Sequence, residues 1–359
     1  MRVMDLTGRE ERFSLAISPG TLYELLVELC AYGLPEDWDT FELGTRWFEN
    51  TRSHISTRLG ASLAMIGPQA GKIWVNLLGL AVQPPALPDI AAFIHRIEAL
   101  PPLDLRLHLL GAHVPAYRRS ISLDVLQSAA LGDLSAQEQL LEDPSYFGGE
   151  ANRMLRPLLS LAVEETKALA VDILRGWHEE VFAPSQTRVA PILERDAAAK
   201  RALLTTLTQE ALIEAASGIQ YTPHPSIRQV YLIPQIAMRP WVLLCEHDDT
   251  RLFCYPVADD SLDGDPTAPP GPLVRVHKAL GDEKRLRMLK ALTARGATLQ
   301  ELADLFGLPK STAHHHLAIL RSAGLVRVTS DDERRYSVRR EVLPETAQLL
   351  ETYLEGGSK

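Results

Sequence analysis

The chain has 359 residues, of which 46 % are hydrophobic and 23 % charged, and this balance is typical of a soluble globular protein with two or three domains. Residues 1–12 are too polar for the core of a signal peptide. The most apolar stretch, residues 63–82, contains a proline, a lysine, an asparagine and three glycines, so no membrane span is expected. Three cysteines do not make a disulfide framework, which predicts a cytoplasmic location.

Charge is distributed unevenly along the chain. The formal net charge is −9, yet residues 272–359 hold 15 Lys and Arg against 11 Asp and Glu, a net charge of +4. Residues 1–271 therefore carry −13. This asymmetry indicates a small module that faces nucleic acid, attached to an acidic domain.

The acidic part, residues 1–257, is predicted to be mainly helical and to end in a small β-sheet. Apolar residues recur at helical spacing near residues 22–29 and 155–181, and further helices are expected at Ala190–Leu204 and Leu207–Ala216. The composition changes over Gln229–Val257, where three runs rich in β-branched and aromatic residues predict a β-hairpin with VYLIP as a third strand.

A segment rich in proline and aspartate, residues 258–272, separates this part from the rest of the chain. It contains four prolines, two glycines and four aspartates and cannot form a helix or a central strand. We place a linker there and expect it to be a stiff tether because it is short and rich in proline.

Residues 273–359 have the pattern of a winged helix-turn-helix, in which a β-hairpin called the wing follows two short helices. A helix is expected at Val274–Leu280, and Asp282 can cap the next one. Thr298 and Glu301 form a capping box at the start of a third helix, and Gly307 supplies the turn after it. Strands at Leu325–Thr329 and Arg335–Val338 flank a wing tip at residues 330–334. The apolar stripe of the last helix, Leu343–Leu354, predicts a dimer contact.

The helix that begins near Pro309 has a narrow apolar seam of Ala313, His316, Leu317 and Leu320. Its other faces carry short polar side chains, as a recognition helix in the DNA major groove requires. Base and phosphate contacts are predicted for these side chains and for cations of the wing, namely Lys310, Ser311, Thr312, His314, His315, Arg334 and Arg335.

The segments HKALGDEKRLRMLKAL and LQELADLFGLPKSTAHHHLAILRSAGLVRV, with the wing after them, resemble the ArsR-type winged-helix repressors. The resemblance covers about a quarter of the chain. It implies a homodimer formed through the first and last helices, Val274–Leu280 and Leu343–Leu354, that binds imperfect palindromes. It further implies a repressor that releases DNA when an effector, such as a small molecule, binds.

The metal sites of that family are absent, because Leu299–Leu305 contains no cysteine and the last helix contains neither histidine nor cysteine. No metal or cofactor is therefore expected. WHEEVFAP at 177–184 and residues 239–257 also resemble a large helical domain that precedes ArsR-type modules in some bacterial regulators, for which we infer no activity.

Three other interpretations of the sequence compete with that of a DNA-binding regulator. Residues 1–257 could be an enzyme or a domain derived from one, but His178, Glu179 and Glu180 fit an amphipathic helix, and we expect no enzyme. His314, His315 and His316 are consecutive on a helix and cannot chelate one ion together.

If Asp249-Thr250 is the hairpin loop, Cys245 lies opposite Cys254 with His247 on the same face, which would allow a thiol or soft-metal sensor. Core thiols are the simpler reading of these cysteines.

Overall fold

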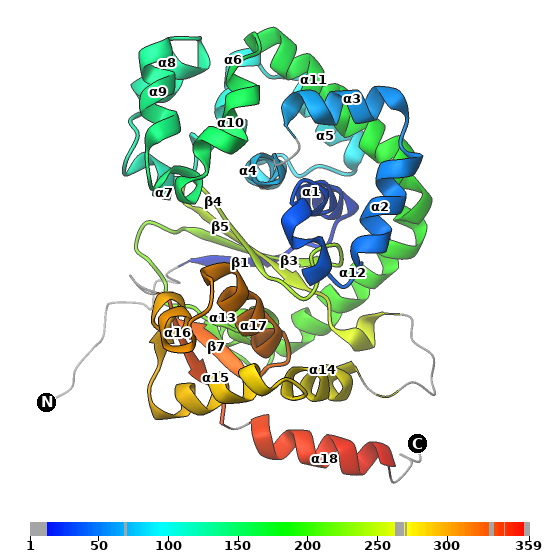
Figure 1. The fold of residues 1–359 in the computed structure, drawn as a ribbon. Helices are drawn as coiled ribbons and strands as arrows, with labels where there is room; N and C mark the ends of the chain where they lie inside the picture. Colours follow the sequence, from blue (N-terminus) through cyan, green and yellow to red (C-terminus); the bar gives the residue numbers. More distant parts are fainter. Residues whose placement is uncertain are drawn as a thin grey trace, which may run out of the picture.

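A computed structural model describes residues 13–67, 70–262, 269, 271–329, 334–340 and 342–354. The chain is mostly α-helical with two small four-stranded sheets, as the sequence predicts (Figure 1). Buried side chains form one large cluster in the N-terminal part, a second around the sheet of that part, and a third within residues 276–338. None of the described helices is both long and apolar enough to cross a membrane.

The helices of the N-terminal part surround α4, which is buried on most sides (Figure 1). Gly71 opens α4 at backbone contact with α1, since a Cβ atom there would lie 2.5 Å from the carbonyl oxygen of Cys30. The α-helices of the N-terminal part are α1 Thr21–Tyr32, α2 Thr45–His54, α3 Thr57–Ile66, α4 Gly71–Val82, α5 Ile90–Ala99, α6 Pro102–Leu109, α7 Pro115–Arg118, α8 Leu123–Ala130, α9 Leu134–Glu142, α10 Ala151–Leu159, α11 Val163–Trp177, α12 Ala183–Leu203 and α13 Gln209–Ser217.

A π-helical segment, His178–Phe182, joins α11 to α12. Within it, the Glu180 carboxylate accepts hydrogen bonds from the backbone N–H (2.6 Å) and the hydroxyl (2.8 Å) of Ser56, which caps α3. Glu180 therefore joins the start of α3 to the segment between α11 and α12, which is a structural role.

The first sheet has the strand order β1-β3-β5-β4 and is covered by α1, α4 and α12. It consists of β1 Ser14–Ile17, β3 Gln229–Gln235, β4 Leu243–His247 and β5 Thr250–Pro256. The predicted hairpin and its third strand are confirmed, with β3 parallel to β5 and β4 antiparallel to it. The strand β1, from the opposite end of the domain, pairs with β3 and was not predicted.

The predicted register of the hairpin was wrong by two residues. Cys245 lies opposite Leu252, and Cys254 lies opposite Leu243, because the loop is Asp248-Asp249 rather than Asp249-Thr250. Asp248 adopts a left-handed φ of +49°, which Asp tolerates better than most residues. Its backbone N–H donates to the carbonyl of His113 at 2.8 Å, and this contact across the fold holds the turn.

The C-terminal module contains α14 Gly271–Leu280, α15 Glu283–Ala294, β6 Ala297–Thr298, α16 Leu299–Phe306, α17 Lys310–Ser322, β7 Val326–Thr329, β8 Arg335–Val338 and α18 Val342–Leu354. The helix α14 begins three residues before the expected Val274, within the segment predicted as linker. The second sheet, β2-β7-β8-β6, includes β2 Ile219–Gln220 from the N-terminal part.

Candidate nucleic-acid interface

The helices α16 and α17 form a helix-turn-helix whose geometry follows from local sequence. The Thr298 hydroxyl accepts from the Glu301 N–H at 3.2 Å, while the Glu301 carboxylate accepts from the Thr298 N–H at 2.8 Å, so the predicted capping box is confirmed. Gly307 ends α16 with a φ of +61°. A side chain at that φ would be strained, which explains the glycine between the two helices.

The apolar seam of α17 lies in the core of the module. Ala313, Leu317 and Leu320 are fully buried, and His316 is buried beside them. Burial lowers the pKa of His316, and its Nδ1 atom has no hydrogen-bond partner among the described residues. His316 is therefore a packing residue, as its position on the helix predicts.

The predicted DNA-contacting residues of α17 fall into two groups. Lys310 and Ser311 at its N-terminus are exposed, and Thr312 and His315 are half-buried. His314 instead faces the N-terminal domain, where its ring lies 4.8 Å from the ring of Trp241. Burial in this contact, reinforced by nearby arginines, lowers the pKa of His314 to about 4.

The two wing arginines also differ. Arg334 is exposed and immediately precedes β8, and the rest of the predicted wing tip, residues 330–333, lies outside the described residues. Arg335 donates to the carbonyl of Gly296 at 2.9 Å and pairs with the Glu301 carboxylate at 3.3 Å. Arg335 thus links the wing to the capping box, a structural role that the sequence pattern did not predict.

The N-terminal domain lies directly against α17 and the wing (Figure 1). The strand β2 pairs in parallel with β7, placing Ile219 beside Val328. Arg327 on β7 lies 3.5 Å from the Glu214 carboxylate on α13. Ala318, one turn after His314 on the same face of α17, is 5 % exposed. The acidic domain therefore covers part of the recognition helix.

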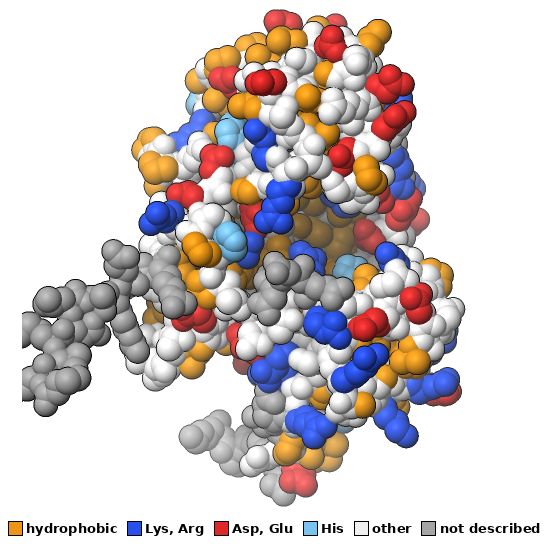
Figure 2. Space-filling model, turned by 90° about the vertical axis from the view of Figure 1, so that its left-hand side faces the viewer, with side chains coloured by type: hydrophobic (Ala, Val, Ile, Leu, Met, Phe, Trp, Pro, Cys, Tyr) orange, Lys and Arg blue, Asp and Glu red, His pale blue; other side chains and the backbone are white. Residues whose placement is uncertain are grey.

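A network of charged side chains also joins the N-terminal domain to the C-terminal module. Asp259 pairs with both Arg239 of the N-terminal domain and Arg275 of α14. A cavity of about 170 Å³ lies between the two parts and is lined by residues of both, Arg239 and Arg321 among them. In Figure 2, Lys and Arg side chains gather over the lower part of the molecule, which the C-terminal module forms.

The hairpin thiols have the properties of core residues. Cys30, Cys245 and Cys254 are all buried. Burial raises the pKa of Cys30 to about 12 and raises that of Cys245 well above its usual range. Since the thiolate is the reactive and metal-binding form, this environment disfavours the thiol sensor considered above.

A core-packed helix-turn-helix followed by a β-hairpin defines the C-terminal module as a DNA-binding domain of the winged-helix class. A family model described as a helix-turn-helix domain matches residues 280–329. The chain is 33 % identical over 84 residues to YceK of Bacillus subtilis (strain 168), an uncharacterized HTH-type transcriptional regulator. The alignment covers 23 % of this chain and 78 % of the relative. No solved structure matches. The chain belongs to the helix-turn-helix transcriptional regulators.

The sequence did not reveal the covering residues, Trp241 and the two-residue strand β2. A two-residue strand has no periodicity, and a half-buried Trp after a proline gives no sign of its partner. Only the tryptophan that follows Arg239 and Pro240 could have drawn attention to this position.

Proposed function

We propose that this protein is a sequence-specific transcriptional regulator whose N-terminal domain controls access to its recognition helix. The observation that supports this proposal most directly is the contact between the rings of His314 and Trp241. A helix that enters the major groove must present its polar face to base edges. With this face against Trp241, Lys310 and Ser311 remain exposed and Thr312 and His315 are half-buried, so this covered arrangement has a low affinity for DNA.

Charge supports the same proposal. Residues 1–271 have a formal charge of −13, and this part of the chain borders the recognition helix and the wing. DNA binding is driven by contacts between cations and phosphates, so an acidic surface at this position opposes it. Release of the module would remove both the steric cover and the repulsion. The covered and the released arrangements are in equilibrium. An effector that binds the N-terminal domain, such as a small molecule, would shift this equilibrium.

We further propose that the regulator acts as a homodimeric repressor on palindromic operators. The face of α18 supports this, because Ala347 and Leu354 are exposed and Leu350 is only half-buried. An apolar stripe left open on a terminal helix is suited to a second copy of the same helix. The side chain of Leu343, the first residue of the predicted stripe, lies outside the described ones.

Selection from random duplexes tests this function. The full-length chain and its Trp241→Ala variant are each used to enrich bound DNA. We expect inverted repeats with half-site centres about 10–11 bp apart, because two recognition helices related by a twofold axis meet successive major grooves. Enrichment should be stronger with Trp241→Ala. Recovery of only asymmetric or single-stranded targets by both proteins would overturn the dimeric model.

A further inference from the structure

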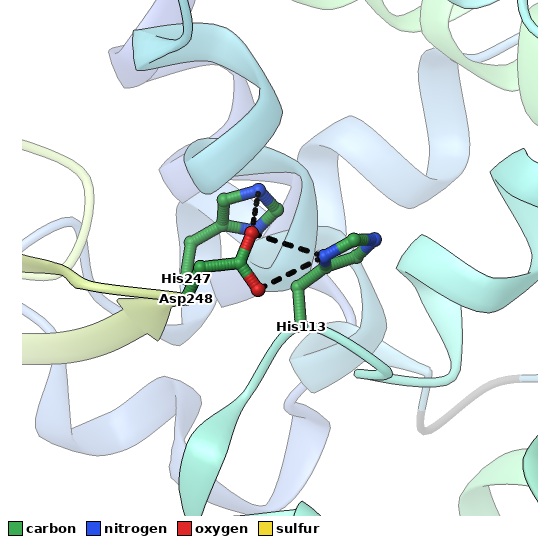
Figure 3. Close-up of side chains that lie close together, drawn as sticks. All are labelled: His113, His247 and Asp248. Atoms are coloured by element: carbon green, nitrogen blue, oxygen red, sulfur yellow. Dashed lines mark hydrogen bonds and ion pairs between the residues drawn. The ribbon is translucent and has the colours of Figure 1, made fainter. Parts of the chain in front are cut away.

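A cluster of imidazoles lies in the N-terminal domain, remote in sequence from the helix-turn-helix. His113 belongs to the loop between α6 and α7, His247 ends β4, and Asp248 begins the hairpin turn. One donor atom from each lies within 4.8 Å of the other two, and no other such group of three is found in the described part of the chain (Figure 3).

The separations of these atoms bring all three within reach of one metal ion. The Nδ1 atom of His113 is 3.2 and 3.3 Å from the two oxygens of Asp248, and Nε2 of His247 is 3.7 Å from the nearer one. These distances are long for charge-assisted hydrogen bonds. Ligands at about 2.0–2.1 Å from a tetrahedral zinc ion are about 3.3 Å apart, which the distances between His113 and Asp248 match, whereas His247 would move closer when an ion binds.

The fold makes space for this arrangement. A Cβ atom on Gly79 of α4 would lie 2.3 Å from the ring of His247, so the imidazole occupies the place of a side chain. Asp248 has its left-handed φ and is tied through its N–H to the carbonyl of His113. The turn therefore sets the carboxylate between the two histidines.

A third imidazole packs against the pair. The ring of His108 lies 4.3 Å from that of His113 and 5.4 Å from that of His247. His108 is 7 % exposed, and its Nδ1 atom has no hydrogen-bond partner among the described residues. The two candidate histidines therefore lie against a third, buried imidazole.

We infer that His113, His247 and Asp248 form a binding site for a divalent transition-metal cation of the zinc type. Two imidazole nitrogens and one carboxylate oxygen are a ligand set that zinc accepts, with a fourth position left for water or another donor. The amide nitrogen of Gln83 lies 2.7 Å from Nε2 of His247, so the Gln83 side chain would turn away when that nitrogen binds the ion. His113 is half-buried and Asp248 exposed, so the site opens to solvent.

To test this proposal, Zn²⁺ is titrated into the full-length chain after a chelator has removed bound metals. Isothermal titration should give one ion per chain, and Co²⁺ should give the visible bands of a four- or five-coordinate site. His113→Ala and Asp248→Asn alter accessible side chains, so both variants should fold. Each should weaken binding at least tenfold. His95→Ala removes an exposed histidine of α5 and is the matched control, with no change expected.

Thermal unfolding supplies a second measurement, because an ion that binds only the folded chain raises its melting temperature. Zn²⁺ should raise that of the wild type and of His95→Ala, but not that of His113→Ala or Asp248→Asn. Absence of stoichiometric binding would overturn the proposal. So would binding that survives both substitutions, or binding that is lost in His315→Ala, which would place the ion on the recognition helix. The proposal is independent of whether the chain binds DNA.

Discussion

Truncation of Trp241 tests how firmly the N-terminal domain holds the recognition helix. The indole contacts His314 with ring centroids 4.8 Å apart and planes inclined by 48°. It is fixed on its own domain, since its Nε1 donates to the hydroxyl of Thr40 at 2.9 Å. Trp241→Ala therefore removes a contact between the domains without altering any residue of the DNA-binding module.

The magnitude follows from the nature of the contact. A pair of aromatic rings contributes about 0.5–1.5 kcal/mol beyond its buried area, so we expect loss of the indole to cost the covered arrangement about 1–2 kcal/mol. Each 1.4 kcal/mol is about a tenfold change in an equilibrium constant. If the covered form dominates, the apparent Kd for DNA scales inversely with the open fraction, and Trp241→Ala should lower it by about 5- to 30-fold.

Fluorescence anisotropy with a labelled operator duplex measures this change at fixed salt concentration. Trp47→Ala is the matched control, because Trp47 is a half-buried indole of the same domain that packs on Phe48 and not on the module. Its Kd should equal that of the wild type. An unchanged or higher Kd for a folded Trp241→Ala protein would refute the reasoning, since the contact would then not limit access to DNA.

Four further predictions concern the same molecule. Glu214→Gln should weaken the pairing with Arg327, a half-buried ion pair worth about 0.2–1 kcal/mol, and so lower the apparent Kd for DNA by no more than about fivefold in the same anisotropy assay. The factor by which Trp241→Ala lowers the apparent Kd for DNA, relative to the wild type, should shrink as the pH falls from 7 to 5. The reason is that burial depresses the pKa of His314 to about 4, so the covered form binds fewer protons and is progressively weakened below pH 6.5; a constant ratio of the two Kd values would exclude His314 as the titrating group. His315→Ala should relax base preference at one operator position at a cost of about 1–3 kcal/mol, whereas Arg334→Ala should weaken binding to all sequences alike and reduce the salt slope by about one, which Kd values on operator and scrambled DNA at several salt concentrations would distinguish. Glu28 is buried and its pKa is raised to about 8 by burial and by Glu24, so its charge destabilises the fold as the pH rises; Glu28→Gln should raise the melting temperature more at pH 9 than at pH 5, and an equal effect at both would contradict this assignment.

Local sequence determined most of the DNA-binding module. Thr298 and Glu301 cap α16 with bonds that span three residues, and Gly307 provides a backbone conformation that only a few residue types accept. The spacing of Ala313, Leu317 and Leu320 fixed the buried side of α17. These features depend on neighbours within one or two helical turns, so the pattern of side chains was sufficient to predict them.

The tertiary structure alone decided what lies against that module and how the hairpin is aligned. The contact of His314 with Trp241 joins residues 73 positions apart in sequence, and neither residue carries a mark of the other. The hairpin turn is held by a hydrogen bond from the N–H of Asp248 to the carbonyl of His113, which belongs to a loop distant in sequence. That same bond brings His113 to His247 and Asp248. Local propensity contains no information on such approaches, because they arise only when the helices pack around the sheet.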